Sequence, residues 1–177
     1  MSDKPAKTPQ QLLEALAEMQ ITTTTTAHEA VKTVAQNQAL RGSISGLHSK
    51  NLFLKDKKGH QWLVVAHEER TIDLKALRKR LGAQTLSFGK PQLLFESLGV
   101  EPGSVSPFSI INDGQRRVQV VLDKIFTTAD QANFHPLINT QTTAISGVDL
   151  LKFFAHLDHP PLIIDFDCAD ITPVENT

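Results

Sequence analysis

Residues 51–66 decide the fold: Asn51-Leu-Phe-Leu-Lys55 and Gln61-Trp-Leu-Val-Val-Ala66 flank the polar connection Asp56-Lys-Lys-Gly59. Both outer runs are rich in the aliphatic and aromatic residues that favour strands. The glycine of the connection suits a tight turn. The stretch therefore predicts a β-hairpin. A hairpin is stable only when other elements cover its apolar face, and the flanking segments supply them.

Helices are predicted on both sides of the hairpin from apolar spacing and from residues that suit helix ends. Thr33-Val-Ala-Gln36 has the spacing of a capping box, so a helix is expected from Thr33 to Gly42, although Thr26-Ala-His-Glu29 offers a competing earlier start. The other expected helices are Gln10–Met19, Asp73–Gly82, Pro91–Leu98 and Ser146–Phe154. Further strands are expected at Ile21–Thr26, Val118–Leu122 and Leu162–Phe166.

The composition predicts a globular protein of the α+β class, because helices and strands are interspersed along a chain with 40% hydrophobic and 21% charged residues. The 177 residues fit one domain, 1–177, with flexible ends at about 1–8 and 168–177. The single cysteine and the polar N-terminal stretch favour a cytoplasmic location. No apolar run approaches the roughly 20 residues that cross a bilayer, so no membrane association is expected.

Several common enzyme classes are excluded by missing motifs. The sequence has no Cys-x-x-Cys, no phosphate-binding loop and no dinucleotide glycine pattern. His156 and His159 have a spacing that would suit a metal, but no third ligand segment accompanies them. No metal or cofactor is therefore expected. The net charge of −1 gives no global support for nucleic-acid binding, which would need a local basic patch.

Lys50 is the first candidate for chemistry. Ser49-Lys50-Asn51 places a cation and an amide at the start of an apolar strand, where a rigid backbone can hold them toward a cleft. Taken alone, the segment favours the simpler interpretation of a solvated lysine at a strand start.

The wider sequence resembles the prolyl-tRNA synthetase insertion-domain-like editing domains, and specifically the free-standing deacylases that hydrolyse alanine mischarged onto tRNA(Pro). The segments that carry the resemblance are Gly46–Lys58, Leu86–Gly89, Leu98–Pro107, Ile111–Asp113, Val121–Asp123 and Phe134–Asn139. The resemblance implies a mixed, largely antiparallel, partly barrel-like sheet flanked by helices. It also implies an aminoacyl-tRNA ester hydrolase that acts without a cofactor.

Site residues follow from the resemblance by position. Lys50 would contact the aminoacylated terminal nucleotide in an electrostatic role, with Asn51 beside it. The loop from Gly103 to Pro107, which includes Ser106, would present amide donors as an oxyanion hole, although the same pattern occurs in ordinary turns. Further substrate-binding candidates are His28, His135, Asn139 and Thr140. A structural role for His135, at the end of a strand, stays open.

One segment departs from the family pattern. Relatives carry prolines and a phenylalanine after the first histidine, whereas this chain reads His28-Glu-Ala-Val-Lys-Thr-Val34. Glu29 and Lys32 would change the shape or polarity of an aminoacyl pocket, so a cysteinyl or seryl ester is an alternative substrate. A catalytically silent module that binds tRNA or protein is the alternative outside enzymes.

A basic helix supplies the local patch that binding to tRNA would need. Its cations are Lys75, Arg78, Lys79 and Arg80. They are expected to contact acceptor-stem phosphates, and a solvated helix face is the alternative. The implied partners are the acceptor end of tRNA(Pro) and prolyl-tRNA synthetase. The sequence leaves the oligomeric state open, and it does not decide whether water or a ribose hydroxyl attacks the ester.

Overall fold

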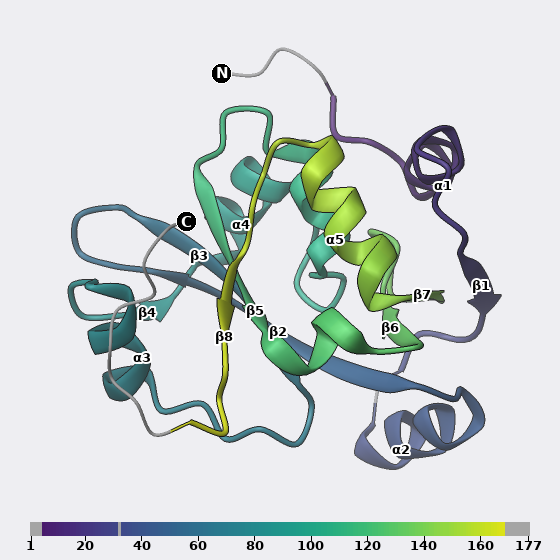
Figure 1. The fold of residues 1–177 in the computed structure, drawn as a ribbon, viewed down its shortest axis with the longest axis horizontal. Helices are drawn as coiled ribbons and strands as arrows, with labels where there is room; N and C mark the ends of the chain where they lie inside the picture. The colour runs from purple at the N-terminus through teal and green to yellow at the C-terminus, as the bar shows by residue number, and fades with distance from the viewer. Residues whose placement is uncertain (1–4, 32, 169–177) are drawn as a thin grey trace.

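The hairpin lies at the centre of the sheet in the computed structural model, which describes residues 5–31 and 33–168 (Figure 1). Its strands are β2 (Leu47–Lys55) and β3 (Gln61–His67), paired antiparallel with Lys50 opposite Ala66. The prediction of a hairpin is confirmed. β2 begins at Leu47 instead of Asn51, which extends the strand toward the site described below.

Eight strands of the described residues form one mixed sheet in the order β1-β7-β6-β2-β3-β5-β8, with β4 also paired to β2. The remaining strands are β1 (Thr24–Ala27), β4 (Ser87–Phe88), β5 (Val118–Asp123), β6 (Ala132–Phe134), β7 (Gln141–Ile145) and β8 (Leu162–Ile164). The pairs β2/β6, β3/β5 and β5/β8 are parallel, and the other pairs are antiparallel. The mixed sheet flanked by helices confirms the expected fold class.

The helices begin where the sequence predicts. Thr8, Thr33, Asp73 and Ser146 each accept a hydrogen bond from a backbone N–H of the first turn. The helices are α1 (Pro9–Glu18), α2 (Val34–Ser43), α3 (Leu74–Leu81), α4 (Pro91–Leu98) and α5 (Gly147–His156). Two short 3₁₀ helices, η1 (Pro107–Asn112) and η2 (Lys124–Thr128), were not predicted, nor were β4, β6 and β7.

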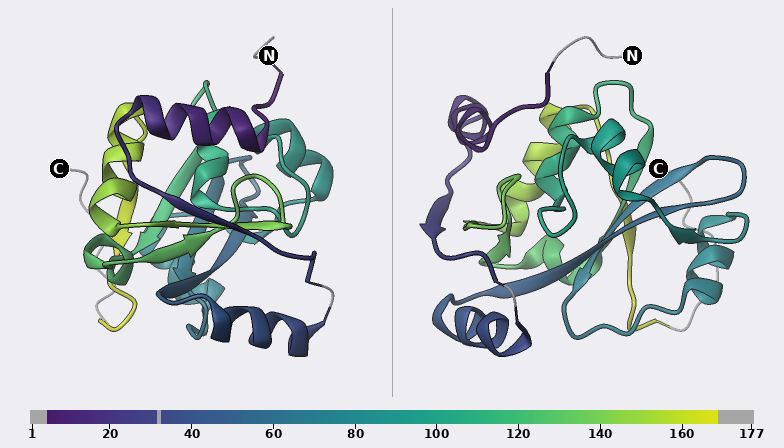
Figure 2. Two further views of the ribbon diagram at one scale, coloured as in Figure 1. Left: turned by 90° about the vertical axis from the view of Figure 1, so that its right-hand side faces the viewer. Right: turned by 180° about the vertical axis from the view of Figure 1, so that it is seen from behind.

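Two cores lie on opposite faces of the hairpin because successive side chains of a strand alternate. Phe53 belongs to the larger core, together with side chains of α1, α4 and α5. Leu54 belongs to the smaller core with Leu77 of α3. Figure 1 shows α3 and α5 on opposite sides of the central strands. In Figure 2, α1 and α2 lie on opposite sides of the strands, and no described side chain of α2 enters either core.

Some expectations fall on residues that the structure does not describe. Lys32 lies outside the described residues, as do positions 1–4 and 169–177 of the segments expected to be flexible. In the part of the chain that is described, no helix has the length and apolar character needed to span a membrane.

Candidate active site

The site begins at a gap in the sheet beside β2. β6 pairs with β2 only at Leu47 and His48, and β4 pairs with it only at Leu54 and Lys55. Across residues 5–31 and 33–168, no strand pairs with residues 49–52 of β2 on that side. We call these residues the open edge. The interruption exposes strand backbone in the middle of the fold.

The hydrogen-bond pattern of the hairpin determines which backbone groups face the open edge. The N–H of Glu68 donates to the carbonyl of His48 at 3.0 Å, so the even-numbered residues of β2 are the ones bonded to β3. In an antiparallel pair, the alternate residues direct their N–H and C=O groups to the other side. Ser49 and Asn51 therefore present backbone donors and acceptors to the open edge.

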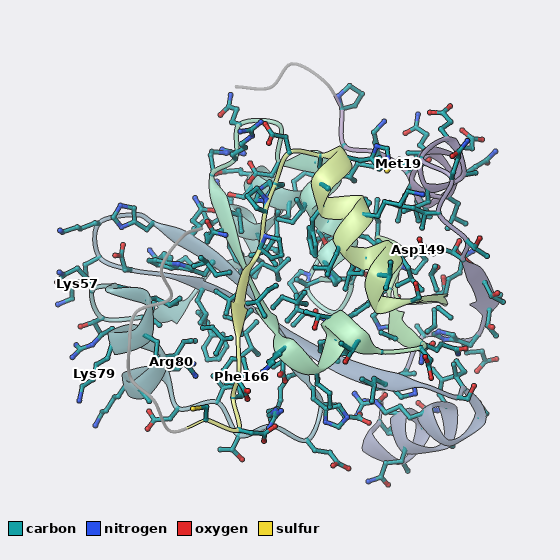
Figure 3. All side chains as sticks on the ribbon, viewed as in Figure 1. Met19, Lys57, Lys79, Arg80, Asp149 and Phe166 are labelled. Atoms are coloured by element: carbon teal, nitrogen blue, oxygen red, sulfur yellow. The ribbon has the colours of Figure 1, made fainter. Side chains whose placement is uncertain are left out.

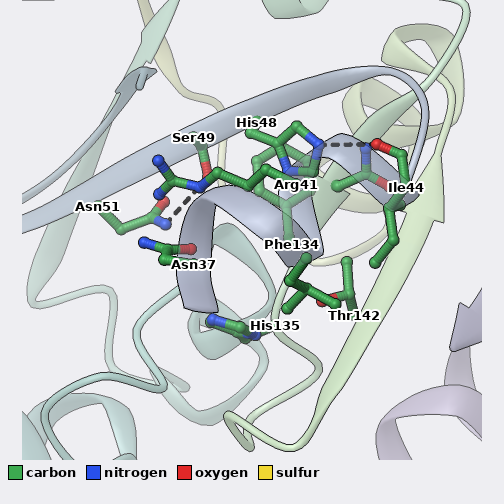
Figure 4. A pocket seen from close by; sticks show the side chains of 11 residues that line it. Asn37, Arg41, Ile44, His48, Ser49, Asn51, Phe134, His135 and Thr142 are labelled. Atoms are coloured by element: carbon green, nitrogen blue, oxygen red, sulfur yellow. Dashed lines mark hydrogen bonds between the residues drawn. The ribbon is translucent and has the colours of Figure 1, made fainter. Parts of the chain in front are cut away.

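A small pocket lies at the open edge, and Figure 4 shows side chains from four elements converging on it. Its volume is about 60 Å³, far below the roughly 300–1,000 Å³ of pockets that enclose drug-sized ligands. The lining residues come from α2, the α2–β2 connection, β2, β6 and β7. They are Asn37, Leu40, Arg41, Ile44, His48, Ser49, Asn51, Asn133, Phe134, His135 and Thr142. The pocket suits a small group.

His135 follows β6 and has a defined tautomer when neutral. Its Nδ1 lies 2.9 Å from the carbonyl oxygen of Gln141. Because a carbonyl only accepts, Nδ1 carries the hydrogen, and Nε2 of the neutral ring has a free lone pair. Burial lowers the pKa of the His135 imidazole below its ordinary value, and the nearby charges of His28 and Arg41 act in the same direction. His135 is therefore a neutral base at the pocket wall.

His28 lies close to His135. The ring centroids of the two histidines are 6.2 Å apart. The backbone N–H of His28 donates to the carbonyl of Thr140 at 2.9 Å, and its Nε2 lies 2.8 Å from Oγ1 of Thr142. Thr142 lines the pocket, so His28 contacts the pocket through it.

The loop that was expected to form an oxyanion hole packs behind His135. The Ser106 hydroxyl donates to the carbonyl of His135 at 2.6 Å, and Ser106 and Pro107 are both buried. Gly103 has φ +90, a left-handed conformation that favours glycine, and a Cβ added there would lie 3.8 Å from Nδ2 of Asn139. The Ser106 end of the loop contacts His135, and no residue of the loop lines the pocket.

Lys50 lies beside the pocket without lining it. It is half-buried, and alternation along β2 places its side chain on the face opposite Asn51. Within the part of the chain that is described, its ammonium group makes no hydrogen bond and no ion pair. The structure therefore holds an uncommitted cation next to the open edge.

The basic helix is not near the pocket. α3 covers the other core, and Figure 3 shows Lys79 and Arg80 on the same side of the molecule as Lys57 of the hairpin turn. Lys75 and Lys79 are exposed and Arg78 is half-buried. Arg80 donates to the carbonyl of Asp165 at 3.0 Å, so its guanidinium is partly committed to the fold.

Arg41 and Asn133 line the pocket and were not predicted. Arg41 of α2 forms an ion pair with Glu68, which follows β3. Asn133 is a buried amide in the middle of β6. No sequence motif marks Arg41. Asn133 could have been found from the sequence, because it is a polar residue directly before Phe134-His135.

His156 ends α5, and His159 follows it in the next connection. His159 contacts the buried carboxylate of Asp113, with Nε2 and Oδ2 3.4 Å apart. Among the residues that the structure describes, no group of three or more His, Cys, Asp or Glu side chains is placed to hold an ion.

Comparisons with known proteins identify the family of this chain. Residues 28–153 match the model of the aminoacyl-tRNA editing domain. The chain is 38% identical over 159 residues to prolyl-tRNA synthetase associated domain-containing protein 1 of Danio rerio, covering 89% of this chain and 86% of that protein. It is 36% identical over 144 residues to the prolyl-tRNA editing protein ProX of Acetoanaerobium sticklandii, covering 81% and 88%.

A solved structure supports the fold alone. The crystal structure of a candidate trans-editing enzyme for prolyl-tRNA synthetase superposes with a TM-score of 0.66 at 17% identity, covering 88% of this chain and 92% of that one. The family model spans most of the chain and includes every residue of the pocket. The chain therefore belongs to the aminoacyl-tRNA editing domain family.

Proposed function

We propose that this protein hydrolyses the ester of mischarged aminoacyl-tRNA, with alanine on tRNA(Pro) as its substrate. The observation that supports the proposal is the small pocket at the open edge, which is lined by both Asn51 and the neutral base His135. A tRNA substrate implies a cytoplasmic location. The names of the relatives suggest prolyl-tRNA synthetase as the enzyme whose errors are cleared.

The chemistry needs a base, donors for an oxyanion and an electrostatic anchor. Nε2 of His135 takes a proton from the attacking water, whose oxygen forms the new bond to the ester carbonyl carbon. The ester carbonyl becomes an oxyanion, which is stabilised by backbone N–H groups of the open edge and by the charge of Lys50. The ribose oxygen then leaves with the proton, which releases the amino acid.

Pocket size provides the selectivity in this proposal. A synthetase site shaped for proline rejects alanine by only about 1–3 kcal/mol for each missing methylene. A second site that is too small for proline separates the two esters by steric exclusion. A pocket of about 60 Å³ is consistent with that role.

A panel of tRNA(Pro) charged with alanine, cysteine, serine or proline tests the proposal. We expect the alanyl ester to be hydrolysed at least about tenfold faster than the prolyl ester, because the prolyl group has two more carbons and a single extra methylene is already worth about that factor. Release of the labelled amino acid is the measurement. Faster release of cysteine or serine would reassign the substrate, and release of none would favour a binding module.

The basic helix is proposed to hold the acceptor stem. Replacing Arg78 and Lys79 together with alanine is expected to weaken tRNA binding severalfold at about 0.1 M salt, because two phosphate contacts are lost. The slope of log K against log salt concentration should also become shallower by about one for each lost contact. Binding measured across a salt series checks this. Replacing the exposed Lys7 and Lys90 together with alanine is the matched control, since it removes two cations outside α3. An equal effect of both changes would indicate that α3 is only a solvated face.

A further inference from the structure

Asn133 is a buried amide whose carbonyl oxygen lacks a protein partner. Its side chain is 3% exposed and lines the pocket. Within the described residues, Oδ1 of Asn133 is a buried acceptor with no hydrogen-bond donor. A buried acceptor without a donor is unfavourable by about 1–3 kcal/mol, so such groups in native proteins usually have a role.

The orientation of this amide is fixed by its other end. Nδ2 of Asn133 donates to the carbonyl oxygens of Ser45 at 2.8 Å and of Leu47 at 3.2 Å. Turning the amide over would place Oδ1 against two carbonyl oxygens, which cannot donate. The orientation of Oδ1 is therefore fixed, and this acceptor lies just beneath the surface of a residue that lines the pocket.

A second acceptor lines the same pocket. Oδ1 of Asn51 is also buried without a donor, while its Nδ2 donates to the Ser49 hydroxyl at 3.1 Å. The two unpartnered acceptors belong to residues that line one small pocket, and a ligand with several N–H donors could donate to both. Arg41, the Lys or Arg side chain among the lining residues, is paired with Glu68. The ion pair reduces the repulsion between the Arg41 charge and a cationic ligand.

The α-amino group of an aminoacyl ester has the required chemistry. It carries two or three N–H donors, according to its protonation, on the carbon next to the ester carbonyl. A pocket of about 60 Å³ has room for this group with a small side chain, but not for a large blocking group. We propose that Asn133, with Asn51, binds the free α-amino group of the substrate and thereby orients the ester at the open edge. This inference rests on the function proposed above.

Alanyl-tRNA(Pro) and propionyl-tRNA(Pro) form the decisive pair of substrates, because they differ only in an amino group or a hydrogen on the α-carbon. Each enzymatic rate is divided by the uncatalysed rate of the same ester, which removes the intrinsic effect of the amino group on reactivity. We expect the wild-type protein to prefer the alanyl ester by about tenfold or more, as for a hydrogen bond to a charged group. We expect Asn133→Ala to bring the ratio close to one.

Two variants separate recognition from structure. Gln131 donates to the same Ser45 carbonyl at 2.7 Å but does not line the pocket, so Gln131→Ala should keep the wild-type ratio. Asn133→Asp keeps an oxygen acceptor, but its second oxygen can take the place of Nδ2 against the Ser45 and Leu47 carbonyls only when it is protonated and donates. The protonated form of this variant should retain the preference for the alanyl ester. Thermal melts establish that each variant is folded.

Equal corrected rates of the wild-type protein on both esters would overturn the inference and leave the deacylase function intact. The inference would also be overturned if Asn133→Ala lowered both rates in proportion, because a purely structural role predicts that result. If the wild-type protein hydrolysed neither ester, the proposed function itself would fail, and the inference with it.

Discussion

Lys50→Ala is expected to lower kcat/KM for Ala-tRNA(Pro) by about 10²- to 10³-fold, the range found when one group that stabilises an oxyanion is removed. Lys50 is half-buried beside the open edge, and among the described residues its ammonium has no partner. The substitution therefore breaks no hydrogen bond or ion pair of that region. The melting temperature should stay close to that of the wild-type protein, and single-turnover hydrolysis should fall.

The position of Lys50 predicts how the loss divides between kcat and KM. Its side chain extends from the face of β2 opposite to that of Asn51. In the proposed mechanism, its charge therefore stabilises the oxyanion across the backbone of the open edge. An interaction that strengthens as the oxyanion develops lowers kcat when it is removed, whereas simple binding of a phosphate raises KM. We expect the larger change in kcat.

Lys55 provides the matched control for this prediction. It is half-buried on the same strand, but it lies where β4 pairs with β2, beyond the open edge. Lys55→Ala should keep nearly full activity. Full activity in Lys50→Ala, or an equal loss in both variants, would remove Lys50 from the mechanism.

The sequence predicts the elements that depend on local signals. Thr33 and Asp73 cap their helices because a side-chain oxygen accepts from the first turn, and Gly82 and Gly99 end theirs in the left-handed conformation that glycine favours. β4 and β6 were missed because they span only Ser87–Phe88 and Ala132–Phe134. Strands this short are defined by distant partners more than by their own composition.

The pocket depends on such distant pairing. The parallel contact between β2 and β6 places His48 beside Asn133, two residues far apart in the chain. The sequence identified Asn51 and His135 through the resemblance, but it could not show that β6 leaves β2 after His48. Since the pocket lies at that gap, the positions of Arg41 and Asn133 in its lining become visible only in three dimensions.

His135→Ala is expected to lower kcat by about 10²- to 10⁴-fold, the contribution of a positioned general base. Its Nδ1 is fixed on the Gln141 carbonyl, so Nε2 is the basic atom available to the pocket. Catalysis by a base requires the neutral ring. Because burial lowers the pKa of His135, activity should stay level near pH 7 and fall only on the acid side. The midpoint of that fall should lie below the ordinary histidine value of about 6.5.

His135→Asn separates catalysis by the base from simple anchoring of the segment. The amide nitrogen of asparagine can take the place of Nδ1 and donate to the Gln141 carbonyl, but the side chain has no atom equivalent to basic Nε2. If His135 is the base, His135→Asn folds normally, loses about as much activity as His135→Ala, and loses the acid limb of the pH profile. If His135 only anchors the segment, His135→Asn keeps most of the activity and the profile. The exposed His60, in the turn between β2 and β3, is the control, and His60→Ala should change neither the rate nor its pH dependence.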